Sequence, residues 1–254
     1  MEVHHHPDLH HKKKNFKEYF LEFLMIFLAV TLGFFAENIR ERVANNSKEK
    51  EFISSFKEDL ISDTVALQNV IPENQRQFEK LDSLYTLLEL ARNNKPFAVN
   101  RLYYLNFRYA YGLVYFKANE RTISQVKSTG AFALIKNKAS RDSLTVYYYS
   151  NENDMPINVQ GLKEWTDNLD RLSEKIFDYK HVKTFWFNGG ANIFLSDSLH
   201  LGIDSDKQLL KEYSNKVRAL MMMVNILETV EQGLLTSAKN LIALLNKEYH
   251  LSNQ

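Results

Sequence analysis

YFLEFLMIFLAVTLGFFA, residues 19–36, is the one long apolar block in a chain of 254 residues that is otherwise polar. As a helix it measures about 27 Å at 1.5 Å per residue, against a hydrocarbon core of about 30 Å. Within residues 23–36 there is no charge, and Thr31 is the one polar side chain. A helix lying on a membrane surface needs a polar face. We therefore predict a transmembrane helix that crosses the bilayer once.

Glu22 is the exception inside this block, and two interpretations of it stay open. A carboxylate near the end of a span can reach the headgroups or be neutral, at a lower cost than at the centre. Alternatively, an intramembrane carboxylate serves helix association or proton movement. Glu22 is therefore the candidate intramembrane polar residue.

The flanks of the block bear on processing and orientation. A cleaved signal peptide needs a small residue three positions before the cut, and Phe34 holds that position for a cut after Ala36. We therefore expect an uncleaved signal anchor.

The basic residues within about 15 positions of the span are balanced: Lys12, Lys13, Lys14 and Lys17 precede it, and Arg40, Arg42, Lys48 and Lys50 follow it. We expect the N-terminus to be cytoplasmic and the large domain to lie on the opposite side.

The tail, residues 1–18, combines those lysines with His4, His5, His6, His10 and His11. Neutral imidazole is a good ligand for zinc, copper or nickel. The alternative is a flexible cationic tail that faces anionic lipid. We adopt the second interpretation and assign no metal site and no cofactor.

Residues 37–254 form the large domain, and their low content of helix breakers predicts long helices. The whole chain has 8 Gly and 4 Pro, and no break precedes Pro72, which we place in a kink or a first helical turn. Lys57, Glu58 and Asp59 fall between the apolar positions of the helix that follows the span. Residues 206–250 repeat apolar side chains at helical spacing for about 67 Å. Such a stripe is buried only against other long helices. We predict an all-α fold, in which an N-terminal transmembrane helix continues into an elongated antiparallel helical bundle.

The middle of the domain is less regular. Residues 97–118 are rich in Tyr and Phe, which predicts a buried helix, with a strand or a platform for a planar ligand as alternatives. Residues 121–137 read as a short helix ended by Gly130. Residues 138–149 and 161–179 read as two helices, with a turn at 151–156.

Residues 181–205 have no helical period and predict an irregular segment. It contains an aromatic run beside Gly189 and Gly190. These rings either contact a partner or cover the end of the bundle core, and the residues concerned are Phe185, Trp186 and Phe187.

The chain shows no recognisable chemistry. Its net charge of +1 gives no reason to expect nucleic acid as a partner, and the absence of cysteine excludes thiolate sites and disulfides. No metalloprotease, phosphate-loop or nucleophile-elbow motif is present. The carboxylates are expected on solvated helix faces. We therefore predict no catalytic residue and no enzyme.

Three stretches, MEVHHHPDLHHKKK, EYFLEFLMIFLAVTLGFFAEN and RTISQVKSTGAFALIKN, resemble an uncharacterised family of bacteroidete single-span membrane proteins, a domain of unknown function. The resemblance covers most of the chain and implies an integral membrane protein, but no functional residue carries over. We expect a single-pass protein of the bacterial inner membrane whose large domain is periplasmic.

Two functions follow from these features. The first is a membrane-anchored helical interaction or sensory module, whose partners are the lipid bilayer and a protein partner or a second copy of the chain. The second is a subunit of a membrane complex that uses Glu22 for helix association or proton movement.

Overall fold

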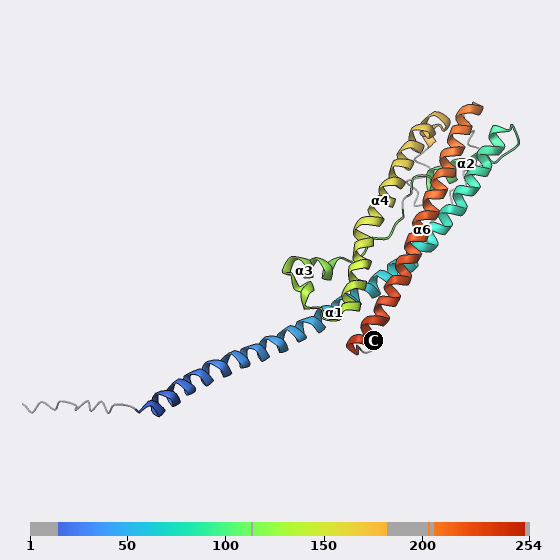
Figure 1. Ribbon diagram of the computed structural model, residues 1–254. Helices are drawn as coiled ribbons and strands as arrows, with labels where there is room; N and C mark the ends of the chain where they lie inside the picture. The colour runs from blue at the N-terminus through green and yellow to red at the C-terminus, as the bar shows by residue number, and fades with distance from the viewer. Residues whose placement is uncertain (1–14, 113, 182–202, 204–205, 252–254) are drawn as a thin grey trace, which may run out of the picture. The chain divides into compact units, whose positions relative to one another are not determined.

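The computed structural model describes residues 15–112, 114–181, 203 and 206–251, and most of these residues form α-helices. These are α1 (Phe16–Arg92), α2 (Val99–Tyr109), α3 (Arg121–Thr129), α4 (Lys138–Ile176) and α6 (Lys207–Tyr249), with 3-10 turns η1 (Ala131–Leu134) and η2 (Tyr179–His181) (Figure 1). The chain divides into a first unit that ends at Glu51 and a second that begins at Phe52. Helix α1 continues without interruption from one to the other. The predicted all-α fold is confirmed.

Helix α1 contains Pro72 in its interior. Proline cannot donate a backbone hydrogen bond, and in a helix interior it costs about 3 kcal/mol or more. The helix persists because the residues on both sides of the proline pack into the second unit: Leu67, Ile71, Asn74 and Gln77 are all buried. Pro72 therefore lies inside a continuous helix, and not in its first turn.

The prediction of two helices over residues 138–179 is wrong, because α4 is a single helix that continues through residues 151–156. Its asparagine side chains do not form a turn there. The Nδ2 atoms of Asn151 and Asn153 donate to the carbonyl oxygens of Tyr147 and Tyr149, each at 2.9 Å. These bonds stay within the helix, and burial of Met155 and Leu162 holds both halves against the bundle.

Helices α1 and α6 pack in opposite directions within the second unit. Asn74 Nδ2 donates to Glu231 Oε2 at 2.7 Å, and further along α1 Arg218 Nη1 lies 3.4 Å from Asp82 Oδ1. As the residue number rises along α1, the residue number of its contact on α6 falls, so the two helices are antiparallel. The predicted pairing of the first and last long helices is confirmed.

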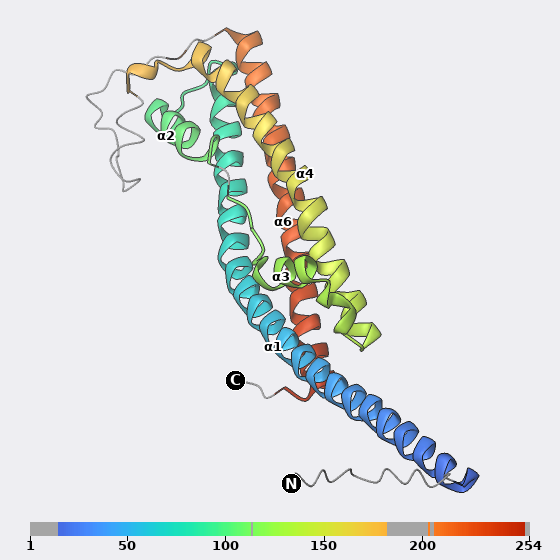
Figure 2. The ribbon, with the colours of Figure 1, turned by 90° about the vertical axis from the view of Figure 1, so that its left-hand side faces the viewer.

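Helix α4 completes the bundle and is also antiparallel to α6. Asn137, the N-cap of α4, donates through Nδ2 to Glu248 Oε2 at 2.7 Å. Near the other end of α4, the Nζ atom of Lys216 lies 4.6 Å from the centre of the Trp165 ring. Figure 2 shows the three long helices side by side, with α2 near one end of the second unit and α3 against its side.

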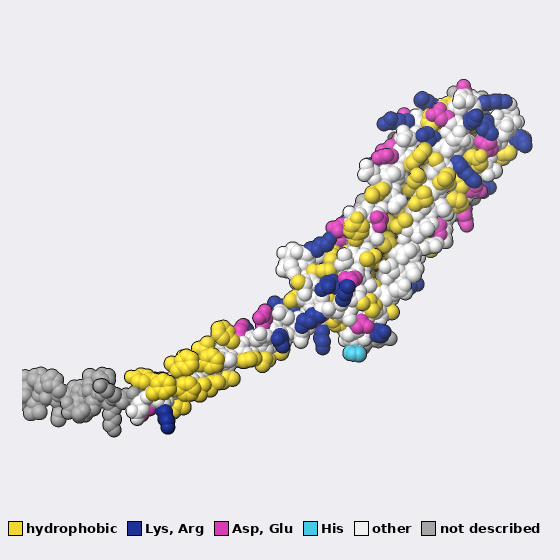
Figure 3. All heavy atoms as spheres, in the orientation of Figure 1, with side chains coloured by type: hydrophobic (Ala, Val, Ile, Leu, Met, Phe, Trp, Pro, Cys, Tyr) yellow, Lys and Arg dark blue, Asp and Glu magenta, His cyan; other side chains and the backbone are white. Residues whose placement is uncertain are grey.

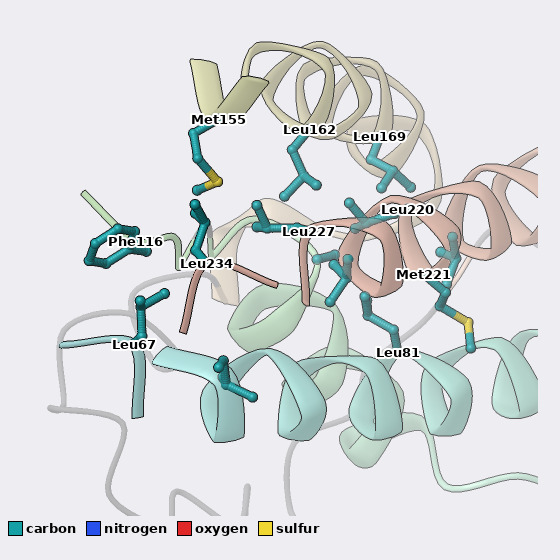
Figure 4. Close-up of a cluster of buried hydrophobic side chains, with 14 of the residues drawn as sticks. Leu67, Leu81, Phe116, Met155, Leu162, Leu169, Leu220, Met221, Leu227 and Leu234 are labelled. Atoms are coloured by element: carbon teal, nitrogen blue, oxygen red, sulfur yellow. The ribbon is translucent and has the colours of Figure 1, made fainter. Parts of the chain in front are cut away.

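The core lies between these three helices (Figure 4). Leu81 from α1, Leu162 and Leu169 from α4, and Leu220 and Leu227 from α6 are almost completely buried. Their spacing along each helix produces one apolar face per helix, and the three faces meet. The bundle is therefore stabilised mainly by burial of these faces, at about 1.5–3 kcal/mol for each fully buried large side chain.

The aromatic stretch forms α2 and packs across the end of the bundle. The Tyr103 ring meets the Phe177 ring edge-on at 5.0 Å, and Asn106 Nδ2 donates to Ser173 Oγ at 3.0 Å. The predicted buried helix is confirmed for residues 99–109, and the alternative of a strand is wrong. Residues 110–112 and 114–120, which we call the connecting segment, have no regular secondary structure.

The short helix α3 ends where the sequence indicates. Gly130 is its C-cap, with a φ of 66°, in the left-handed region that favours glycine. Its N–H bonds the Lys127 carbonyl at 3.3 Å. A glycine is used here because a side chain in this conformation is strained.

We expect Leu227→Ala to lower the free energy of unfolding by about 2–5 kcal/mol, because Leu227 is 1% exposed and its loss leaves a cavity between the helices. Urea unfolding of the full chain in detergent, followed by helical circular dichroism, measures this. Met222→Ala on the same helix is the control, since Met222 is 62% exposed. Equal effects of the two substitutions would contradict the assigned core.

Candidate functional site

The first unit presents an apolar helix surface. From Tyr19 to Phe35 the large hydrophobic side chains of α1 are mostly 47–73% exposed, and Figure 3 shows them gathered along this part of the helix. Soluble proteins rarely expose apolar surface on this scale. Within the described residues, α1 is the one helix long and apolar enough to cross a membrane.

Polar groups in this part of α1 are few. The Thr31 hydroxyl donates to the Phe27 carbonyl at 2.7 Å, so it is satisfied within the helix, as a lipid environment requires. Glu22 lies on the same helix with its side chain exposed. Directly after the apolar block, Arg40 Nε donates to Glu37 Oε2 at 2.8 Å. Glu22 therefore lies inside the apolar block, and the first charges beyond the block pair with each other.

Two predicted features lie outside the described residues. The first is the aromatic run Phe185, Trp186 and Phe187, and the second is the histidine tract of the tail. Within the described residues, no three His, Cys, Asp or Glu side chains come close enough together to hold a metal ion.

The connecting segment is held by buried polar side chains that sequence analysis did not single out. Gln77 Nε2 donates to the carbonyls of Tyr109 and Gly112, at 2.9 and 2.6 Å. Glu231 Oε1 accepts from the Phe116 N–H at 3.0 Å. Two aspartates of α1 act in the same way at the far end of the segment.

These two are Asp63 and Asp59. Asp63 Oδ1 accepts from the Asn119 N–H at 2.8 Å, and Asp59 Oδ2 accepts from the Thr122 N–H at 3.0 Å. The second bond caps α3, because the N-cap residue Glu120 contributes no side-chain hydrogen bond. We call Asp59, Asp63, Gln77 and Glu231 the polar clamp.

The polar clamp exists because irregular backbone has no internal hydrogen bonds. A buried N–H or carbonyl without a partner costs about 1–3 kcal/mol, and Phe116, in the middle of the segment, is 2% exposed. Side chains from the two neighbouring helices supply the partners instead. The clamp therefore lets the segment lie against the core, where Phe116 packs beside Leu234 and Leu67 (Figure 4).

Burial changes the acid–base behaviour of the clamp. It raises the pKa of Asp63 to about 6, more than the bonds from Asn119 and Tyr147 lower it, and the nearby Asp59 adds to the rise. The Tyr147 hydroxyl donates to Asp63 Oδ2 at 2.8 Å. Burial also raises the pKa of Glu231. Asp59 is balanced by Arg121, whose Nη2 lies 2.8 Å from Asp59 Oδ1.

The prediction that carboxylates lie on solvated faces is wrong for Asp59, Asp63 and Glu231, each at most 2% exposed. The sequence contains a pattern that indicates the burial of Asp63 and of Glu231. Asp63 lies three residues after Leu60 and four before Leu67. Glu231 lies four residues after Leu227 and three before Leu234. Both therefore interrupt an apolar stripe. Their carboxylates are buried and accept from backbone N–H groups, so the polar clamp holds the connecting segment and α3 in place.

Comparisons with protein-family models, with curated proteins and with solved structures find no match for this chain. The resemblance to bacteroidete single-span membrane proteins stays a prediction.

We expect Asp63→Asn to remove a pH dependence of stability. The folded-state pKa of about 6 exceeds the ordinary 3.8, so between these values the folded chain binds more protons than the unfolded chain. Asp63 therefore makes the free energy of unfolding fall as pH rises from about 4 to about 6, by on the order of 1–3 kcal/mol. Asparagine keeps an acceptor for the Asn119 N–H but does not titrate.

Urea unfolding of both proteins from pH 4 to pH 7 measures this difference. Glu79→Gln is the matched control, since Glu79 is an exposed carboxylate on the same helix. A constant difference between wild type and Asp63→Asn over that range would contradict the assigned titration.

Proposed function

We propose that this protein is a membrane-anchored helical interaction or sensory module. The observation that carries the proposal is the apolar surface of α1 over residues 19–36, whose large side chains have no cover in the first unit. Transfer of such side chains from water into hydrocarbon is favourable by about 0.8 kcal/mol for each CH₂ group. A lipid bilayer would cover all of these exposed apolar side chains.

The continuity of α1 supports a role in coupling. The same helix that carries the apolar block supplies Asp59, Asp63 and Gln77 of the polar clamp. It joins the anchor to the bundle without a loop. A displacement of the bundle along or about this helix is therefore passed to the anchor through continuous backbone hydrogen bonds.

The exposed face of α4 supports a protein partner or a second copy. Val146, Tyr149 and Ile157 are 61–71% exposed and fall on one side of the helix by their spacing. Exposed apolar side chains that gather on one face suit an interface better than solvent.

We place the protein in a bacterial inner membrane, with a cytoplasmic N-terminus and a periplasmic bundle. The four lysines before the span lie within residues 12–17, whereas the four basic residues after it are spread over residues 40–50. A bundle that follows an uncleaved signal anchor with a cytoplasmic N-terminus lies in the periplasm.

Cysteine labelling tests the anchor and its orientation together, because the natural chain contains no cysteine. We expect Met222→Cys to react with a membrane-impermeant maleimide in intact bacterial cells, since Met222 is an exposed residue of the bundle. Phe16→Cys, at the other side of the span, is expected to react only after the membrane is opened. Both proteins should stay in the membrane pellet at alkaline pH.

Release of the chain at alkaline pH would overturn the anchor. Labelling of Phe16→Cys alone in intact cells would reverse the orientation and leave the anchor in place.

The position of Glu22 inside the apolar block favours the second candidate function, a subunit of a membrane complex. A carboxylate within the apolar block is costly in lipid unless it meets a partner group. We expect Glu22→Gln to change the yield of crosslinked oligomers or partners, or the proton flux of reconstituted vesicles. Glu41→Gln, beyond the block, is the matched control. Unchanged crosslinking and flux in Glu22→Gln would reject this candidate.

A further inference from the structure

A pocket of about 300 Å³ lies beside the last turns of α4, where α2 and η2 meet that helix. Its lining combines aromatic rings with two carboxylates, from Phe107, Tyr111, Thr166, Asp167, Asp170 and Tyr179. We propose that this pocket binds a small, free organic ammonium ion. The proposal goes beyond the anchored module and does not depend on the membrane.

The aromatic part of the pocket is a connected group of rings. The Phe107 ring is stacked against the Tyr111 ring, at 6.2 Å between centres and 26° between planes. It meets the Tyr179 ring edge-on at 5.2 Å and 89°. These contacts restrict the orientation of each ring. Aromatic rings attract an organic cation through their negative faces, most strongly where water is excluded.

Among the described residues, the charged part of the pocket is acidic. Asp167 and Asp170 line it, and no Lys, Arg or His of the described part of the chain does so. The Tyr179 hydroxyl donates to Asp170 Oδ1 at 2.9 Å, which orients this carboxylate and leaves Oδ2 for another donor. Over the described residues, neither aspartate belongs to an ion pair with Lys or Arg. An anion is disfavoured by both charges, and a cation is favoured by both.

Buried hydrogen bonds behind the rings hold the pocket in shape. The Tyr213 hydroxyl donates to Asn106 Oδ1, and Asn106 Nδ2 donates to Ser173 Oγ at 3.0 Å. All three residues are at most 1% exposed, and they join α6, α2 and α4. Burial raises the pKa of Tyr111 and of Tyr179. These hydroxyls therefore stay neutral and protonated, and the negative charge of the pocket resides on the aspartates.

The size of the pocket restricts the ligand. A volume of about 300 Å³ is at the lower end of small-molecule sites. An ion with a few carbon atoms around or beside its nitrogen fits this space. It places its apolar groups against the rings and its charge near Asp170.

Calorimetric titration of the full chain in dodecyl maltoside, a detergent without an ammonium group, tests the proposal. The probes are choline, n-butylammonium and 3,3-dimethylbutan-1-ol, which has the shape of choline but no charge. We expect saturable binding of at least one ammonium ion, with a Kd below about 1 mM, and at least tenfold weaker binding of the neutral alcohol.

Two variants locate the site. Asp170→Asn and Tyr179→Leu should each weaken binding of the ammonium ion at least tenfold, since one removes a charge and the other removes a ring. Asp154→Asn is the control, an exposed aspartate on the same helix. Asp167→Asn serves as the second charge variant if Asp170→Asn loses helical circular dichroism.

Equal binding of the neutral alcohol, no saturable binding of either ammonium ion, or unchanged binding by the folded charge variants would overturn the proposal. Binding confined to glycerophosphocholine, added as a fourth probe, would overturn the free ion in favour of a lipid headgroup. None of these outcomes depends on alkaline extraction or cysteine labelling, so failure here and failure of the anchored module are distinguishable.

Discussion

The second unit depends on the satisfaction of buried backbone groups in the connecting segment. The described residues of the connecting segment, 110–112 and 114–120, form no regular structure, yet Phe116 lies in the core. Such a path is stable only when every buried N–H and carbonyl finds a partner. Asp59, Asp63, Gln77 and Glu231 supply these partners from two antiparallel helices. A purely apolar interface between α1 and α6 would leave the segment without partners.

This arrangement explains why the bundle tolerates buried carboxylates. Asp63 and Glu231 each interrupt an apolar stripe, and their loss of hydration on burial raises the pKa of both. Each also fixes a defined atom of the segment, so the register between helices and segment is unique. A buried polar group that bonds one defined atom favours one arrangement where apolar packing alone permits several. The clamp thus contributes specificity as well as hydrogen bonds.

The apolar block and the bundle share one helix but differ in which of its faces are apolar. Over residues 19–36 the apolar side chains of α1 face outward on all sides, and Thr31 satisfies its hydroxyl within the helix. Beyond Phe52 the same helix is amphipathic, with its apolar and clamp residues turned to the core. The change from one pattern to the other marks the transition from an exposed apolar surface to a face that is buried against other helices. It occurs without a break because no Gly or Pro lies between residues 34 and 71.

The sequence by itself determined the helical class, the apolar block, the ends of α3 and α6, and the pairing of the first and last long helices, because these depend on local periodicity and capping residues. It misplaced a turn at residues 151–156, since asparagine-rich turn signals are overridden when both flanking stretches are buried. Only the tertiary structure decided that Asp59, Asp63 and Glu231 are buried and that Asp170, which accepts from the Tyr179 hydroxyl, lines a pocket together with Tyr111. The physical reason is that hydration of a carboxylate depends on neighbours distant in the chain, and a single helix period does not encode them.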